Sequence, residues 1–390
     1  MVQKRDFRHV THFPGTHGND LDRILHLMDD LEQVPAGLFV GLLLLVALPA
    51  AWADWNAAGM LWVFMLGDWA LLAGLPRRGV SYGPAKANVL ILGVLRLPFA
   101  FLPDAWALGA QLIGTALVAY GFWIEPHRLT VTHQTLHCPK LDPGLPPLRV
   151  LHLGDLHIER ITQRERDVVA LTRQLAPDLV LFSGDFLNLS YIYDPIAQAD
   201  CRRILTELGG LPIPLGVLAV TGSPAVDKDD VVPALLEGLP LRWLHGERVT
   251  LDHGGHRFDV VGLACSHKPF EDAPQVQALL DDAVHQRLTI LLYHSPDLAP
   301  DAAEMGIDLQ LSGHTHAGQI RLPGLGPLMT GSLYGKALES GRKQLGHLVL
   351  YVTRGLGLEG KGAPRMRFLC PPEIILWEIS GAPYQEEASQ

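Results

Sequence analysis

Residues 148–157 read LRVLHLGDLH, and this stretch decides the fold class of the C-terminal half of the chain. A short apolar run rich in Leu and Val ends at Gly154, and Asp155 and His157 follow at once. Apolar runs of this length without helical spacing are typical of buried strands. The stretch therefore predicts a buried strand that carries an acid and a histidine at its carboxyl end.

Further short apolar runs repeat this pattern. They are residues 178–183, 215–220, 288–293, 308–311 and 348–352. Amphipathic stretches that read as helices lie between them, at residues 163–175, 197–208, 231–239 and 274–284. Strands that alternate with helices are typical of an α/β fold. We therefore expect an α/β domain over residues 148–385 and a tail at residues 386–390.

The chain before this domain is strongly apolar. Three stretches with at most one charge are long enough to cross a hydrocarbon core of about 30 Å, namely residues 34–53, 57–75 and 105–123. Residues 88–102 are shorter and contain Arg96 and Pro98, so a short third span and a re-entrant helix both remain open. Arg96 and Asp68 invite a functional reading or pair near a helix end.

These stretches divide the N-terminal part of the chain. We expect a polar segment at residues 1–33, an all-α transmembrane region of about four helices at residues 34–124, and a connector at residues 125–147. Basic residues favour the cytoplasmic end of a span, and Arg77, Arg78 and Lys86 lie between the second and third spans. Four spans then place the α/β domain in the cytoplasm, whereas three would place it outside.

Composition narrows the partners and the location. The net charge is -10, and residues 1–147 hold 10 basic and 11 acidic side chains, so residues 148–390 hold 21 and 30. An acidic domain argues against a nucleic-acid partner, because nucleic acid binds through Lys and Arg. The four cysteines are widely spaced, which fits free thiols in a reducing compartment. We expect a multi-pass protein of the cell membrane with a cytoplasmic domain.

Ligand-type residues follow four of the expected strands. They are two aspartates and four histidines: Asp155, His157, Asp185, His294, His314 and His316. Ligands of open α/β sheets bind beyond the carboxyl ends of strands. Mixed carboxylate and imidazole sets suit Mn, Fe or Zn ions better than Ca or Mg. We expect two divalent metal ions about 3.5–4 Å apart that share the carboxylate of Asp185.

Four motifs stand in order along the domain: Asp-x-His at 155–157, Gly-Asp-x-x-Asn at 184–188, the lone His294, and Gly-His-x-His at 313–316. Together they resemble the calcineurin-like metallophosphoesterase superfamily. Residues 313–323 and 353–357 further resemble its membrane-attached bacterial members, which include enzymes that cleave UDP-2,3-diacylglucosamine and phosphodiesterases of the cell envelope.

The resemblance implies a four-layer αββα sandwich with metals at the strand ends. It also implies that Asp155, His157 and His316 bind a first metal ion, that Asp185 bridges two ions, and that His294 and His314 bind the second. Candidate catalytic residues are then Asp185, His314 and Asp227. Candidate substrate contacts are Asn188, Arg321 and Arg354, for which loop structure or salt bridges are the alternative.

The third family motif, Gly-Asn-His-Asp or Gly-Asn-His-Glu, is degenerate in this chain. Ser223 stands where the family has an Asn ligand, and Pro224 where it has a His that assists the leaving group. A proline side chain neither donates nor accepts a proton. Asp227 either replaces the missing ligand or is a solvated loop acid.

The predicted activity is hydrolysis of a phosphoester or pyrophosphate bond by metal-activated water. The membrane region favours a lipid-linked or nucleotide-lipid substrate. The alternative is a catalytically impaired binding or regulatory membrane protein with the same fold.

Overall fold

A computed structural model describes residues 2–16, 28, 30–360 and 363–381 of the chain, so the predicted tail at 386–390 lies outside the described residues. The chain forms two compact units. One comprises Met1–Asn19, Arg128–Leu358 and Leu369–Gln390, and the other Asp20–His127 and Glu359–Phe368. The second unit is therefore a helical insertion in the sequence of the first.

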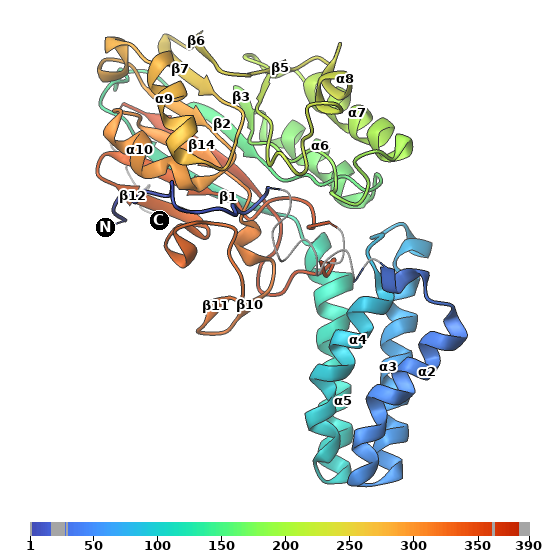
Figure 1. The fold of residues 1–390 in the computed structure, drawn as a ribbon. Coiled ribbons are helices and arrows are strands. Elements are labelled where there is room, and N and C mark those ends of the chain that lie inside the picture. Colours follow the sequence, from blue (N-terminus) through green and yellow to red (C-terminus); the bar gives the residue numbers. More distant parts are fainter. Residues whose placement is uncertain (1, 17–27, 29, 361–362, 382–390) are drawn as a thin grey trace, which may run out of the picture. The chain divides into compact units, whose positions relative to one another are not determined.

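Two six-stranded sheets form the centre of the first unit (Figure 1). The first sheet has the order β1 (Thr130–His137), β14 (Glu373–Ser380), β2 (Leu148–Leu153), β3 (Leu179–Phe182), β4 (Val217–Ala219) and β5 (Arg242–Trp243). The second has the order β12 (Gly341–Leu345), β13 (Leu348–Val352), β9 (Leu309–Ser312), β8 (Thr289–Leu292), β7 (His256–Gly262) and β6 (Glu247–His253). A short hairpin of β10 (Arg321–Leu322) and β11 (Gly326–Pro327) lies outside both sheets.

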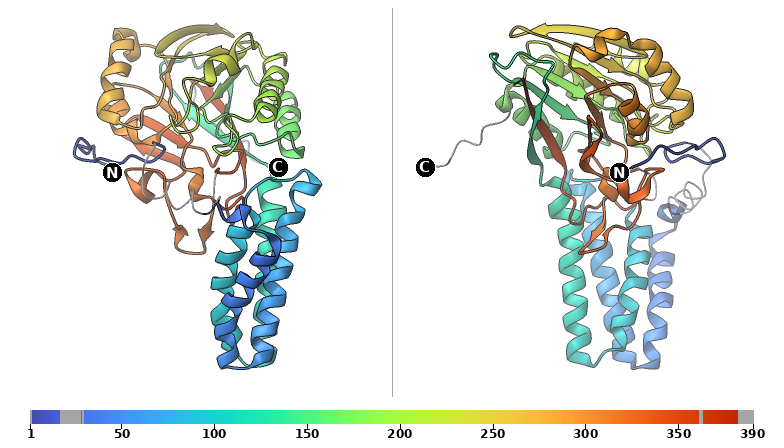
Figure 2. Two further views of the ribbon diagram at one scale, coloured as in Figure 1. Left: turned by 45° about the vertical axis from the view of Figure 1, so that its right-hand side comes forward. Right: turned by 90° about the vertical axis from the view of Figure 1, so that its left-hand side faces the viewer.

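Helices cover the outer face of each sheet, and the inner faces pack on each other (Figure 2). Helices α6 (Gln163–Leu175), α7 (Pro195–Gly209) and α8 (Val232–Leu236) pack on the first sheet. Helices α9 (Pro269–Leu279) and α10 (Ala299–Glu304) pack on the second. The four-layer αββα fold is confirmed. Buried Leu, Val and Ile side chains alternate between the two faces of each strand, which is what a sheet covered on both sides requires.

The six expected strands are all present, within two residues at each end. Helix α9 begins at Pro269, five residues before the expected start at Pro274, because an earlier proline occupies its first turn. The structure also differs at residues 125–147, described above as a connector, since β1 lies there and pairs in parallel with β14. The apolar-run pattern identifies neither β1 nor β14.

The described N-terminal residues 2–16 pack on the α/β unit. Phe7 and Phe13 are buried in the core beside α9 and α10, and Lys4 Nζ lies 2.7 Å from Asp301 Oδ1. Phe7 contacts Tyr334 edge to face, with ring centroids 5.2 Å apart. Residues 2–16 have a polar composition that predicts a separate segment. In the structure, Phe7 and Phe13 nevertheless anchor them to the core.

The described residues 30–127 of the helical unit form four main helices. Helix α2 (Ala36–Ala47) continues as a 3-10 helix, Leu48–Trp52, and α4 (Ala85–Arg96) likewise continues as Leu97–Phe101. Helices α3 (Trp55–Gly74) and α5 (Asp104–Ala119) extend with their final turns to 24 residues each, Trp55–Arg78 and Asp104–His127. These two are long and apolar enough to cross a membrane, and Ala36–Trp52 is shorter.

A buried ion pair joins α3 to α4 in this unit. The Nε and Nη2 atoms of Arg96 donate to the two carboxylate oxygens of Asp68 at 2.8 and 2.9 Å. The remaining N–H groups donate to Gln111 and Thr115 of α5. The sequence left open a functional role or a structural ion pair for Arg96 and Asp68, and in the structure the two side chains form an ion pair.

Candidate metal centre

The carboxyl ends of four strands meet at one place in the first unit. Asp155 and His157 follow β2, Asp185 follows β3, His294 follows β8, and His314 and His316 follow β9. All but His314 are buried, and that side chain lies at the same edge. The structure therefore brings together every metal-ligand candidate of the sequence analysis.

The first group consists of Asp155, His157 and His316, whose potential ligand atoms lie within 4.8 Å of one another. The Nε2 atoms of the two histidines are 2.9 Å apart. Asp155 Oδ1 accepts a hydrogen bond from the backbone N–H of His314 at 2.9 Å. Asp155 Oδ2 is buried and has no hydrogen-bond partner among the described residues, as expected of an atom that binds a cation.

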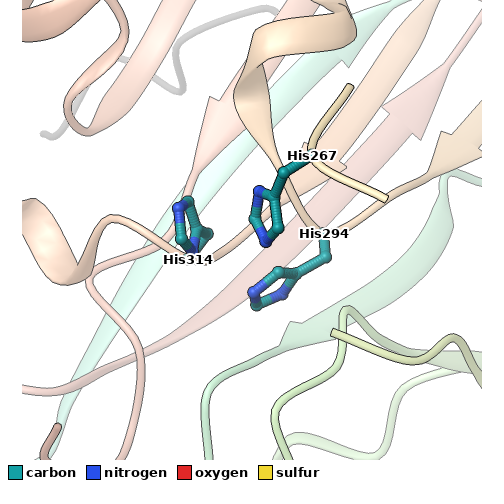
Figure 3. Close-up of side chains that lie close together, drawn as sticks. All are labelled: His267, His294 and His314. Carbon is teal, nitrogen blue, oxygen red and sulfur yellow. The ribbon is translucent and has the colours of Figure 1, made fainter. Parts of the chain in front are cut away.

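The second group consists of His267, His294 and His314, again within 4.8 Å of one another (Figure 3). His294 Nδ1 donates to the carbonyl oxygen of Ser183 at 2.8 Å, and His314 Nε2 donates to that of Gly331 at 2.9 Å. Each bond fixes the tautomer, so His294 Nε2 and His314 Nδ1 keep their lone pairs for a ligand. Metal-binding histidines have this arrangement.

Asp185 lies between the two groups. Its Oδ2 is 3.3 Å from His294 Nε2 in the second group and 3.5 Å from His157 Nε2 in the first. Its Oδ1 accepts a hydrogen bond from the backbone N–H of Ser223 at 2.7 Å. Gly222 lies against this carboxylate, and a Cβ atom there would be 2.1 Å from Oδ1. One carboxylate oxygen thus faces both groups.

The pKa values at the centre are shifted in both directions: burial lowers the pKa of His294, but Asp185 and Asp155 outweigh burial and raise it to about 9. Burial and the neighbouring His294 lower the pKa of His314 to about 3, and burial together with His314 and His294 holds the pKa of His267 well below its usual value. Neutral imidazole is the form that binds metal ions. Burial raises the pKa of Asp155 to about 6, whereas His294 and His157 outweigh burial at Asp185 and lower its pKa.

Backbone strain is concentrated at this centre. Ten described residues other than glycine have a positive φ angle. Six of them belong to the two groups or lie between them: Asp155, His157, Asp185, His267, His314 and His316, with φ from 43° to 70°. Such conformations cost energy and cluster at functional sites. The surrounding fold therefore holds these side chains in place.

The degenerate third motif lies beside the second group. Ser223 Oγ is 3.1 Å from His294 Nε2 and 3.3 Å from His314 Nδ1. Asp227 is buried, and its two carboxylate oxygens accept hydrogen bonds from the backbone N–H groups of Asp185, Phe186 and Gly222. The alternative of a solvated loop acid is therefore wrong for Asp227.

The three candidate substrate contacts are engaged in structural interactions. Asn188 donates to the carbonyl oxygen of Leu358 at 2.9 Å. Arg321 Nη2 is 2.8 Å from Glu339 Oε1, and Arg354 Nη2 is 2.9 Å from Glu373 Oε2.

His267 is the member of the centre that sequence reasoning missed. It lies beyond the end of β7, a strand that the apolar-run pattern did not identify, and no recognised motif surrounds it. One feature of the sequence could have identified it: His267 follows the apolar run Val260–Cys265, as the other candidate ligands follow theirs.

Two groups of His and Asp side chains that could hold divalent metal ions flank one carboxylate at the ends of parallel strands, and centres of this kind hydrolyse phosphate esters. The sequence model of the calcineurin-like phosphoesterases matches residues 148–318. The chain belongs to the calcineurin-like phosphoesterase family, and it is a metal-dependent enzyme that hydrolyses phosphoester bonds.

Bacterial relatives support this assignment. The chain is 28% identical to the uncharacterized metallophosphoesterase YkuE of Bacillus subtilis, over 70% of this chain and 93% of the relative. It is 30% identical to an uncharacterized metallophosphoesterase of Helicobacter pylori, over 66% and 67%. It is 26% identical to the UDP-2,3-diacylglucosamine pyrophosphatase LpxG of Chlamydia trachomatis, over 65% and 90%.

Proposed function

We propose that this protein is a membrane-bound phosphohydrolase with two metal ions that cleaves a pyrophosphate or phosphoester bond in a lipid-linked substrate. In this proposal Asp155, His157 and His316 hold the first ion, His294 and His314 hold the second, and Asp185 bridges them. The observation that carries it is the position of Asp185 Oδ2, within 3.5 Å of one histidine from each group.

The residues of the centre have different roles in the proposed hydrolysis. When bound by these residues, two divalent ions would lower the pKa of a water molecule and neutralise charge on the phosphoryl group. Asp185 holds the two groups of ligands beside each other. The hydrogen bonds of His294 and His314 to backbone carbonyls keep each imidazole in the tautomer whose other nitrogen can bind a metal ion. Water adds to phosphorus, the bond to the leaving group breaks, and the water proton passes to solvent.

The absence of a histidine at position 224 favours a particular substrate chemistry. Pro224 offers no proton to a departing oxygen. A substrate whose leaving group departs as a stable anion needs no such proton, and the phosphate half of a pyrophosphate is of this kind. LpxG, named as a pyrophosphatase, has such a substrate. We therefore favour a pyrophosphate bond over an alkyl phosphate ester.

The helical unit supports a membrane location. Nineteen of the 25 exposed large hydrophobic side chains of the described residues lie between Leu38 and Ile124. The apolar windows of the two longest helices are only 33% and 28% buried, so they are not core helices of a soluble unit. Trp52, Trp55 and Trp106 are 94%, 73% and 74% exposed at helix ends, as in the aromatic belts of membrane proteins.

The charge distribution supports one orientation. Arg77 and Arg78 lie between α3 and α4 and Lys86 lies in the first turn of α4, whereas the turns at Asp54 and Pro103 carry no Lys or Arg. Four crossings with these basic residues inside place the catalytic unit in the cytoplasm. A substrate lipid of the inner leaflet is then the natural partner.

The first experiment is Mn²⁺-dependent hydrolysis of bis(p-nitrophenyl) phosphate by the purified full chain and by Asp185→Ala prepared identically. We expect turnover that chelation abolishes and that falls at least about 100-fold in the variant. Equal rates in both proteins would overturn the assignment of the centre. Phenyl phosphate diesters with progressively poorer leaving groups should then show a steep fall in rate, as the missing acid requires.

The lipid substrate is tested with UDP-2,3-diacylglucosamine in mixed micelles, against UDP-glucose as the soluble control. We expect cleavage of the lipid and slower cleavage of the sugar nucleotide. Equal rates on both would exclude lipid recognition and leave the hydrolytic centre intact.

A further inference from the structure

Three neighbouring parallel strands each deliver a histidine to the second group. Strand β8 lies between β7 and β9 and pairs in parallel with both. His267, His294 and His314 follow β7, β8 and β9 respectively, and Figure 3 shows the three rings lying close together. The family pattern described above accounts for His294 and His314, and it assigns nothing to His267.

Ser223 marks the position that the family gives to an asparagine ligand. Its hydroxyl lies 3.1 Å from His267 Nε2, 3.1 Å from His294 Nε2 and 3.3 Å from His314 Nδ1. Donors of a tetrahedral ion with bonds of about 2.0–2.1 Å lie about 3.3–3.4 Å apart. Each of the three nitrogens thus lies from Ser223 Oγ at nearly the distance that separates two donors of one ion, and the ligand atoms of the three histidines lie within 4.8 Å of one another.

The backbone of His267 resembles that of the other candidate ligands. Its φ angle is 62°, in the same left-handed region as those of Asp185 at 60° and His314 at 70°. A non-glycine residue stays in this region only where its surroundings hold it there. His267 is also only 1% exposed, so its imidazole is shielded from solvent beside His294 and His314.

We propose that His267 is a ligand of the second metal ion and replaces the asparagine that the family has at position 223. The second ion then has three imidazole nitrogens and the carboxylate of Asp185, and the inference rests on the two-metal function proposed above. An imidazole-rich set favours Zn²⁺ or Co²⁺ over Mg²⁺, which prefers oxygen ligands. The loss of the family asparagine is therefore compensated from a different strand.

The test counts metal ions in the full chain in detergent by equilibrium dialysis against Co²⁺ followed by elemental analysis. We expect two ions per wild-type chain. In His267→Ala we expect the first ion unchanged and the affinity for the second lower by roughly 100-fold. The exposed His245 provides a matched control, and His245→Ala should bind both ions as the wild type does. Unchanged affinity for both ions in His267→Ala would overturn the proposal.

Two further variants keep the proposal testable if His267→Ala folds poorly. His267→Cys should show a thiolate-to-Co²⁺ charge-transfer band that grows with the second equivalent, and a bound second ion without this band would overturn the assignment. The double variant Ser223→Asn with His267→Ala should regain the second ion through the family ligand. Full turnover in Asp185→Ala, alongside a second ion in the wild type that His267→Ala loses, would instead contradict the proposed function and leave His267 as a ligand.

Discussion

The carboxylate of Asp227 accepts a hydrogen bond from the backbone N–H of Asp185, with an N to Oδ2 distance of 2.8 Å. The same carboxylate accepts from Gly222 at 2.7 Å and from Phe186 at 3.0 Å. Asp185 itself has a φ angle of 60°. Asp227 therefore stabilises the strained turn that aims Asp185 between the two metal groups.

Replacement of Asp227 by Asn tests this positioning role. An amide presents one acceptor oxygen, so at least one buried N–H loses its partner, at a cost of about 1–3 kcal/mol. We expect a lower midpoint of thermal unfolding and weaker binding of both metal ions. The exposed Asp229 is the control, and Asp229→Asn should change neither. Wild-type metal affinity in Asp227→Asn would show that Asp185 is held by other contacts.

Gly15 tests the contact between the N-terminal segment and the second group. Its carbonyl oxygen accepts from the backbone N–H of Ala225 at 3.2 Å, and a Cβ atom there would lie 2.4 Å from His267 Nε2. Gly15→Val should displace either the segment or the imidazole, and turnover should fall about 10-fold or more. Gly254 has a similarly positive φ with no neighbour within 4 Å, so Gly254→Val controls for strain alone. Equal losses in both variants would refute the steric explanation.

The pair of Arg96 and Asp68 predicts a pattern of stability in the helical unit. Removal of one partner leaves an uncompensated buried charge, so Asp68→Leu should destabilise the unit by about 3–5 kcal/mol. The double variant Asp68→Leu with Arg96→Met should recover most of that loss, because no charge stays buried. Thermal unfolding in detergent measures both, with the exposed Arg77→Gln as control. A double variant as unstable as the single one would contradict a purely structural pair.

Asp297 predicts a pH dependence of stability. Its carboxylate accepts hydrogen bonds from Ser332 Oγ and from the backbone N–H of Leu333. Ser332 directly follows Gly331, whose carbonyl oxygen accepts a hydrogen bond from His314. Burial nevertheless raises the pKa of Asp297 to about 6 from a usual 3.8. The folded state holds the proton more tightly than the unfolded state, so stability falls as pH rises from about 4 to about 6 and then levels off.

A variant without this titration isolates the effect. Between pH 4 and pH 7 the wild type should lose about 2.4 kcal/mol relative to Asp297→Asn. Unfolding midpoints of the two proteins across this range measure the difference, and the exposed Asp282→Asn should run parallel to the wild type. Parallel curves for Asp297→Asn as well would show that the carboxyl titrates normally.

The predictable parts of this molecule are those with local signals. Strands β2, β3, β8 and β9 are short runs rich in Leu, Val and Ile that end in ligand-type residues, so the α/β class and the six metal candidates follow from short stretches, whereas the four-layer arrangement came from the family resemblance. Strand β1, with the sequence TVTHQTLH, has few apolar residues because it is an edge strand, and no local pattern reveals it.

The remaining features depend on tertiary contacts. His267 joins the centre only because β7 pairs beside β8, and a single histidine carries no information about its neighbouring strand. Likewise the sequence places Asp227 near the missing Asn but cannot distinguish a metal ligand from an acceptor of three backbone N–H groups.

The packing of Phe7 against Tyr334 has a consequence for biosynthesis. Phe7 acquires this partner only after more than three hundred further residues have been translated. Helices α2 to α5 emerge in between, so the N-terminal stretch must wait while a complete helical insertion is made. Deletion of residues 2–16 should therefore impair the last step of folding, in which Gly15 comes to lie against His267.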